Sequence, residues 1–527
     1  MSFLYVWCFL CSLISIMTLR SRLDTWIKSS DQRRLLDIVV LVAMASIFRL
    51  LARPLHRTGF GYDEQWFVWG GWAITRGQAP YLDFIDLKPP VGFLVNAAGV
   101  ALFGLNALAY RYVMAILAFF ALALLYLAMR SRGHELLLAM CVTSLVLFLI
   151  LDQRFHDNSL DDMESIGFAF FLSGISILLM AGKSAWLNAT GGAMLAAAVL
   201  TKEPFVLSAI PAFASCIFLR APRPRTELVR AACWGAVGGI AFGLAIAIYL
   251  ALIGGLGGYV DVVTFYRRFA DEYCVVLGIF HRSTFIGEFT QSLVSLRRGF
   301  LNWQTLGSLS PFLALGLIAA VVLRRTGALL AVLTVLGALY SITLGHCFWI
   351  HYVTMAFAPV ALLSVAGADL TAERIMKTRY AWPARVVLIS LMVFTLGPRV
   401  WSETGKRYRR PDPPFEPQLV EFIRKTTSAT DTIFTAGEPG IYAFADRQSA
   451  LANGTYTDEF FDFLPGNTDE EKVEPAFAEL MKKKPKIVLF ETVLGEERKR
   501  RYFKALFLPY VQSMGYREVR RGVFVLP

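Results

Sequence analysis

A stretch of the chain, residues 61–90, carries a dense set of charged and aromatic side chains between long apolar runs. It contains the acid pair Asp63 and Glu64, with Asp86 and Lys88 further along. A carboxylate can take a proton from a hydroxyl, and a nearby cation can stabilise a departing anion. The pattern therefore indicates acid–base chemistry on a group that leaves with negative charge. An interfacial belt of aromatics with solvated charges is the alternative explanation, and it alone accounts for the tryptophans.

The composition places this stretch in a membrane protein. Of the 527 residues, 56% are hydrophobic and 17% are charged, and the mean hydropathy is +0.52. A soluble protein of this length could not keep so much apolar surface from aggregating. The net charge of +12 is explained first by loops that face the cytoplasm and anionic lipid, and no nucleic-acid partner is expected. The seven cysteines are scattered, nearly all of them inside apolar runs, and support neither a disulfide framework nor a metal site.

Eleven apolar runs are long enough, or nearly so, to cross a bilayer as helices of about 17 to 25 residues. They begin near Leu35, Leu108, Glu135, Ile166, Trp186, Phe205, Ala231, Leu306, Gly327, Tyr352 and Ala384. Phe3–Leu19 lacks the basic start and cleavage site of a signal peptide, so we expect a twelfth helix, with a start codon assigned too early as the alternative. Val91–Phe103 is too short to span the membrane and predicts an interfacial helix.

Lysines and arginines gather in alternate loops, which indicates the orientation of the chain. The expected organisation has three parts. Residues 1–34 form an apolar segment and a basic cytoplasmic loop, residues 35–400 form the transmembrane domain, and residues 401–527 lie outside the membrane. The outer loops of the transmembrane domain are then residues 54–106, 152–165 and 254–305.

The composition changes to that of a soluble domain after a proline-rich linker at residues 411–417. Helices are expected at Leu419–Lys425, Glu470–Lys484 and Glu497–Met514, a buried strand at Lys486–Glu491 and a hairpin at Tyr516–Leu526. These elements predict a small α/β domain outside the membrane. The chain has no internal repeat and no nucleotide-binding motif, so an activity driven by a bound nucleotide is not expected.

Sugar transfer from a lipid-linked donor fits carboxylates and a lysine on the outer face of a helical bundle. A carboxylate would take the proton from an acceptor hydroxyl, and a cation would stabilise the departing lipid phosphate. Because no nucleotide-sugar pool exists outside the cell, the donor must be a lipid that crosses the membrane. Each acid alone is weak evidence, since an exposed acid pair is usually a solvated surface or a helix cap.

Some fifty residues of this region resemble the first outer loop of the GT-C superfamily of membrane glycosyltransferases. The branch is that of the protein O-mannosyltransferases and the lipid A aminoarabinose transferase. Its pattern is an acid pair, an aromatic residue, G-x-x-P-Y, K-P-P, and F-G before an arginine. The matching positions are Asp63 and Glu64, Trp66, Gly77–Tyr81, Lys88–Pro90, Phe103–Gly104 and Arg111. The resemblance implies a polytopic α-helical GT-C fold of about 11 to 12 transmembrane helices, with the small extracytoplasmic α/β domain at the C-terminus.

Looser matches extend this resemblance along the chain. They are DQRFHDNSLDDMES around residues 152–165, TKEP at Thr201–Pro204, YRRFADEY at Tyr266–Tyr273, and HY at His351–Tyr352. The resemblance implies that Asp63 is the base and that Glu64, Asp161 or Glu164 orients the acceptor. It implies that Lys88, Lys202 and Arg268 bind the donor phosphate. The implied substrate contacts are Tyr62, Trp66, Tyr81, Asp86, Tyr266, Arg267, His351 and Tyr352.

Each looser match has a structural alternative. Lys202 could form an interfacial turn pair with Glu203, Arg267 and Arg268 could bind lipid headgroups, and His351 could serve structure alone. Some relatives hold a divalent ion with a glutamate and a histidine, but here Leu87 precedes Lys88 and no histidine aligns. We therefore expect no metal and no other cofactor.

The favoured interpretation is an inverting glycosyltransferase that moves one sugar from a polyprenyl-phosphate donor to a glycan, lipid or protein acceptor. It would lie as a multi-pass protein in a bacterial inner (plasma) membrane, in contact with membrane lipid, with its active site and C-terminal domain on the periplasmic side. The alternative is a lipid or polysaccharide transporter that uses the same cavity for passage. Transporter charges gather near the membrane midplane and often show a two-fold repeat. The candidate charges here lie at helix ends, which favours an enzyme.

Overall fold

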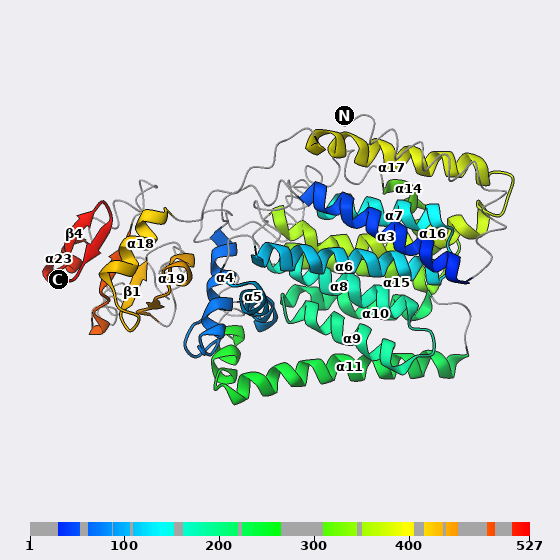
Figure 1. Cartoon of the computed structure of the whole chain (residues 1–527). Coiled ribbons are helices and arrows are strands. Elements are labelled where there is room, and N and C mark those ends of the chain that lie inside the picture. Colours follow the sequence, from blue (N-terminus) through cyan, green and yellow to red (C-terminus); the bar gives the residue numbers. More distant parts are fainter. Residues whose placement is uncertain are drawn as a thin grey trace.

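The computed structural model describes twelve stretches of the chain. They are residues 30–52, 62–86, 88–105, 109–151, 162–219, 224–264, 309–344, 350–404, 416–435, 439–451, 482–490 and 508–527. A helical bundle forms one end of the molecule and a small sheet domain forms the other, with two short helices between them (Figure 1). The expected N-terminal helix Phe3–Leu19 lies outside the described residues.

Each of the eleven predicted apolar runs is a helix. The bundle consists of α3 (Ser30–Ala52), α6 (Ala109–Ser131), α7 (Leu136–Ile150), α8 (Met163–Met180), α9 (Ala185–Val199), α10 (Val206–Phe218), α11 (Arg225–Leu252), α14 (Ser310–Val321), α15 (Thr326–Leu344), α16 (Phe357–Arg374) and α17 (Ala381–Thr404). Two 3-10 turns precede bundle helices: η3 (Glu203–Phe205) leads into α10, and η4 (Ile350–Ala356) leads into α16. The predicted helical architecture is confirmed.

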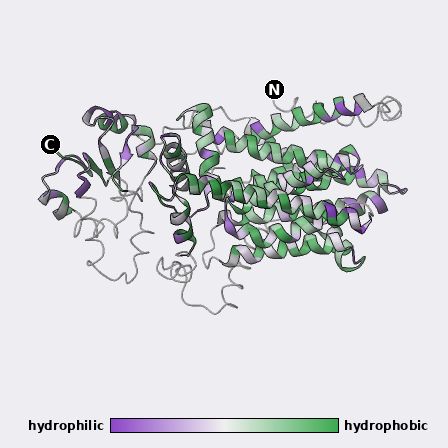
Figure 2. Ribbon diagram, turned by 90° about the horizontal axis from the view of Figure 1, so that it is seen from below, coloured by the Kyte–Doolittle hydropathy of each residue, from purple (hydrophilic) through white to green (hydrophobic). Residues whose placement is uncertain are grey.

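Length and hydropathy identify a multi-pass membrane protein. Within the described residues, six helices are long and apolar enough to cross a membrane, and α14 with α15 pass the same test as a pair bent by 120°. The bundle is mainly hydrophobic along its length (Figure 2). On the outside of α11, Val237, Ile240, Leu244 and Ile248 are exposed. In a bilayer these side chains face lipid, which removes them from water.

Small residues let helices approach closely where α11 packs on α9. A Cβ on Gly192 would lie 1.9 Å from the carbonyl oxygen of Gly235, and one on Gly238 would lie 1.9 Å from that of Ala189. Any side chain at these glycines would therefore clash with the facing backbone. Close backbone approach replaces hydrophobic burial as the main source of helix association inside a membrane.

Two short helices, α4 (Tyr62–Thr75) and α5 (Pro90–Phe103), cover the end of the bundle. The helix predicted over Val91–Phe103 is confirmed, and Pro90 starts it at the position where a proline costs no hydrogen bond. The helix α4 was not predicted from the sequence. The two helices touch at glycines, because a Cβ on Gly70 would lie 2.5 Å from the Phe93 ring and one on Gly71 would meet the backbone of Asn96.

The described residues of the C-terminal region form a five-stranded mixed sheet with the order β2-β1-β3-β5-β4. Its elements are α18 (Pro417–Thr426), β1 (Thr432–Thr435), α19 (Gly440–Ala445), β2 (Gln448–Ser449), β3 (Ile487–Leu489), α23 (Leu508–Ser513), β4 (Arg517–Arg520) and β5 (Val523–Val525). The central strand β1 pairs in parallel with β2 and β3, and β5 is antiparallel to β3 and β4. The predicted first helix, buried strand and hairpin are confirmed, whereas β1, α19 and β2 were not predicted. Most of the predicted helices Glu470–Lys484 and Glu497–Met514 lies outside the described residues.

Candidate active site

The first turn of α4 carries the acid pair. Because α4 begins at Tyr62, Asp63 and Glu64 lie where backbone N–H groups and the helix dipole favour negative charge. The side chains of Tyr62 and Asp63 are outside the described part of the structure. The start of α4 therefore fixes the backbone position of Asp63, the predicted base. The next residue, Glu64, has defined side-chain contacts.

Glu64 forms a bidentate ion pair with Arg111 at the start of α6. The Arg111 Nε donates to Glu64 Oε1 at 2.6 Å, and its Nη2 donates to Glu64 Oε2 at 2.7 Å. The two side chains are 1% and 2% exposed. Two parallel charge-assisted bonds fix both distance and direction. The pair holds the start of α4 against the bundle, and Arg111 is a residue whose role the sequence analysis did not assign.

The second buried pair joins Glu164 to Lys202. Asp162 begins α8 as its N-cap, because its carboxylate accepts the backbone N–H of Ser165 at 2.5 Å. Glu164 then lies in the first turn, 2% exposed, and accepts a hydrogen bond from the Lys202 ammonium. The Tyr352 ring lies 3.9 Å from the Lys202 nitrogen, within range of a cation–π interaction. Three predicted site residues from three helix ends are thus in contact.

The TKEP turn brings Lys202 to this place. Val199 ends α9, and Lys202 precedes η3, which contains Pro204. The Ser341 hydroxyl of α15 donates to the carbonyl of Pro204 at 2.7 Å, which ties the turn to the bundle. The N–H of Val91 donates to the carbonyl of Leu200 at 3.1 Å. This last bond places the K-P-P loop directly beside the lysine turn.

The K-P-P loop is ordered by its own side chains. Tyr81 has a positive φ of 66°, a conformation that costs energy for a residue other than glycine. Its N–H donates to the carbonyl of Phe84 at 2.6 Å, and its hydroxyl donates to the carbonyl of Lys88 at 2.5 Å. The Asp86 carboxylate accepts the Lys88 N–H at 2.8 Å. These bonds fix the Lys88 backbone before any ligand binds.

Glu203 adds a carboxylate that the sequence analysis treated only as part of a turn pair. Burial raises the pKa of Glu203, while the charges of Lys202 and Lys88 act to lower it and the Asp86 carboxylate acts to raise it. The charges of the lysine turn and of the K-P-P loop therefore act on the same carboxyl group. Burial also raises the pKa of Tyr81, with the Asp86 carboxylate as the next cause. An acid between the lysine and the proline of TKEP was the signal that could have identified Glu203.

The remaining predicted residues divide into two groups. Trp66 lies on α4 with its ring edge-on to Trp69, at 5.4 Å between centroids, and its contact is therefore aromatic packing. The backbone of His351 lies in η4 beside Tyr352, and its side chain is outside the described residues. Also outside the described residues are Asp161, Tyr266, Arg267 and Arg268. Their roles stay predictions.

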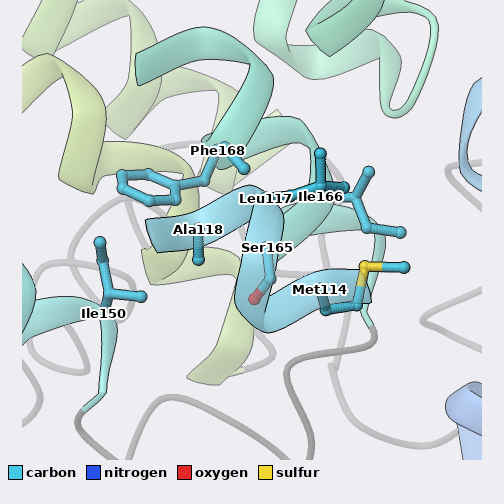
Figure 3. Close-up of a pocket in the computed structure, with 8 residues that line it drawn as sticks. Met114, Leu117, Ala118, Ile150, Ser165, Ile166 and Phe168 are labelled. Atoms are coloured by element: carbon cyan, nitrogen blue, oxygen red, sulfur yellow. The ribbon is translucent and has the colours of Figure 1, made fainter. Parts of the chain in front are cut away.

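A small apolar pocket lies between α6, α7 and α8 (Figure 3). It is lined by Met114, Leu117, Ala118, Ile150, Ser165, Ile166, Phe168 and Ala169. Met114 follows Arg111 by one helical turn, and Ser165 follows Glu164 directly. Both buried ion pairs therefore border apolar surface at the same end of the bundle. Among the described residues, no group of three histidine, cysteine or acidic side chains is arranged to hold a metal ion.

Comparison with solved structures identifies the fold. No protein-family model matches the chain, and no curated protein matches its sequence. ArnT from Cupriavidus metallidurans bound to undecaprenyl phosphate aligns with a TM-score of 0.57 and 13% identity, over 93% of this chain and 97% of that chain. The Archaeoglobus fulgidus oligosaccharyltransferase in complex with Zn and sulfate aligns with a TM-score of 0.54 and 14% identity, over 92% and 72%. The chain thus adopts the fold of these GT-C proteins, and the fold predicted from its sequence motif is confirmed.

Proposed function

We propose that the chain is an inverting glycosyltransferase that moves one sugar from a polyprenyl-phosphate donor to an acceptor on the outer face of the membrane. One observation carries the proposal: Lys202 contacts Glu164, and the K-P-P loop that carries Lys88 is hydrogen-bonded to the lysine turn through Val91 and Leu200. The likeness to ArnT, whose structure holds undecaprenyl phosphate, supports the same class of donor. We assign the protein to a bacterial inner membrane, with this end on the periplasmic side.

In the proposed reaction, Asp63 takes the proton of an acceptor hydroxyl while the hydroxyl oxygen attacks the anomeric carbon of the donor sugar. The bond between that carbon and the phosphate oxygen breaks, and the phosphate keeps the electron pair. Attack from the face opposite the leaving group inverts the configuration. Lys88 and Lys202, with the predicted Arg268, stabilise the charge that builds on the phosphate.

The buried partners have supporting roles in this proposal. An ammonium carries three N–H donors, so Lys202 can hold Glu164 and a phosphate oxygen at once. Glu164 and Tyr352 would then aim the ammonium, while Glu64 and Arg111 hold the start of α4. The acceptor is a glycan, lipid or protein that presents a hydroxyl from outside.

The direct test is transfer by purified protein in detergent, with polyprenyl-phosphate sugars as donors and envelope fractions as acceptors. Mass spectrometry of glycans and polyprenyl phosphates from a deletion strain identifies which sugar is lost and which donor accumulates. A transporter would instead move labelled lipid across proteoliposomes without forming a new glycosidic bond. That result, with no transfer product, would refute the proposed function.

Lys88→Ala should lower the turnover number by about ten-fold to a hundred-fold, as well as weakening donor binding. The reason is that the phosphate gains charge in the transition state, so its cations help more there than in the ground state. The measurement is kcat and KM for the donor. Lys183→Ala is the matched control, because Lys183 is an exposed lysine paired with Glu227 before α9. A change in KM alone would make the substituted lysine a binding contact only.

Sugar transfer should survive chelation and should require no nucleotide. Lys88, Lys202 and Arg268 could together supply about the charge that a divalent ion supplies in other transferases. The assay compares rates with and without EDTA, and with and without added nucleotide. Activity that falls with EDTA and returns with magnesium or manganese would contradict the prediction. Asp86 and Glu164, together with Asp83 and Asp161, would then be the first ligands to test.

A further inference from the structure

The C-terminal domain contacts the helix that begins with the acid pair. Figure 1 shows α19 beside α4, between the sheet and the bundle. The ring of Tyr442 on α19 lies 5.8 Å from the ring of Trp69 on α4. Tyr442 is 0% exposed and Trp69 is 2% exposed. The two parts of the molecule therefore share a dry aromatic contact, which is typical of a stable interface.

A second contact lies at least one helical turn from the Tyr442–Trp69 contact along each helix. Together the two contacts fix the direction of α4 relative to α19. Arg76, just after the end of α4, pairs with Asp446, and the guanidinium also lies 5.9 Å from the Trp72 ring. Asp446 caps α19 in the left-handed conformation, with φ 56° and ψ 50°. Helices commonly end in that conformation, and aspartate tolerates it better than most residues do. The ion pair is about half exposed, so it contributes orientation more than binding energy.

Hydrogen bonds anchor α19 rigidly within its own domain. The buried guanidinium of Arg447 donates to the Thr427 carbonyl at 2.7 Å and to the Thr427 hydroxyl at 2.6 Å. The Tyr442 hydroxyl accepts the Thr435 N–H at 3.0 Å, which ties α19 to β1. Displacement of the domain would therefore move α19 as one body and would disturb its contact with α4.

We propose that the C-terminal domain is a positioning part of the active site, and that Tyr442 and Asp446 hold α4 in the orientation that the base Asp63 needs. On its other side α4 rests on α5 through Gly70 and Gly71. The helix α4 is therefore held between α5 and α19. The expected effect on kcat rests on the proposed function, whereas the docking of α19 on α4 does not depend on it.

A charge-reversal cycle tests this proposal without removing a buried group. Arg76→Asp and Asp446→Arg should each lower kcat by about ten-fold with little change in the KM for donor, because a small misplacement of a catalytic group is costly. The double variant, with both charges exchanged, should restore kcat to within about three-fold of the wild type. Glu416→Arg is the matched control, since the exposed Glu416–Arg520 pair belongs to the same domain and lies away from α4.

Hydrogen exchange of peptides covering residues 62–75 provides a second measurement that does not depend on activity. The single variants should exchange faster in α4, and the double variant and the control should not. Unchanged kcat in both single variants would overturn the positioning role, and so would loss of kcat that the double variant fails to restore. If the wild type transferred no sugar, the proposed function would fail, whereas unchanged exchange in α4 would independently overturn the docking.

Discussion

Asp63→Asn is expected to lower the turnover of sugar transfer by about two to four orders of magnitude, the usual scale for loss of a general base. The amide has nearly the same shape as the carboxylate, but it cannot take the acceptor proton. Asp63 lies in the first turn of α4, directly before Glu64, whose two oxygens are held by Arg111. The substitution therefore leaves that anchor in place. Donor binding and folding should be retained.

The measurements are single-turnover rates, donor affinity and thermal unfolding of the purified variant. Asp261→Asn is the matched control, because Asp261 is an exposed carboxylate in the helical residues 256–264 that pack on the loop near Tyr81. A purified Asp63→Asn variant that transfers sugar at nearly the wild-type rate would remove Asp63 from the mechanism. A transporter would show a milder effect and no transfer in either protein.

The apolar helices could be predicted from the sequence because a bilayer imposes a length and a composition on each span. The start of α4 shows the limit of this approach. Its sequence YDEQWFVWGGWAIT is packed by α5 on one side and by α19 on another, and Phe67, Val68, Trp69 and Trp72 are all buried. A helix buried on several faces has no polar side, so it lacks the amphipathic period on which a prediction from sequence depends.

The site residues could be predicted by type but their partners could not. Glu164 was assigned to the acceptor by resemblance, and the structure adds its contact with Lys202, 38 positions along the chain. Glu64 likewise meets Arg111 across 47 positions. Local spacing carries no information about such pairs, because one is created by the packing of α4 against α6 and the other by the approach of the turn after α9 to the start of α8. A buried charge must be paired, so the presence of each partner, though not its identity, follows from burial.

The domain contact was also beyond sequence reasoning. Tyr442 and Asp446 match no motif, and β1, α19 and β2 are too short to stand out from the surrounding loops. Parallel pairing of β1 with β3 joins residues more than fifty positions apart. Only the folded sheet shows which turn of the domain faces the bundle. The sequence indicated a separate domain, and the structure shows that its core is continuous with that of the bundle.

Arg111→Met is expected to destabilise the protein strongly, by about 3 to 5 kcal/mol, because it leaves the Glu64 carboxylate buried without its partner. Glu64 is 1% exposed, and both its oxygens accept bonds from Arg111. The double variant Glu64→Leu with Arg111→Met should recover most of this loss, since an apolar pair of similar volume is often no less stable than a buried ion pair. Thermal unfolding in detergent, with all three proteins at one pH, provides the comparison.

The same cycle separates stability from catalysis. If Glu64 acts only by anchoring α4, the double variant should regain stability but keep a lowered kcat, because an apolar contact lacks the fixed direction of two parallel hydrogen bonds. Full recovery of both quantities would mean that α19 and α5 suffice to orient the helix. Arg385→Met serves as the control, since its pair with Glu135 is 20% and 39% exposed and lies where α17 meets α7. Water can solvate Glu135 once the arginine is lost, so this variant should unfold within a few degrees of the wild type. If Arg111→Met and Arg385→Met destabilised the protein equally, burial of the unpaired Glu64 carboxylate would not be the cause of the destabilisation.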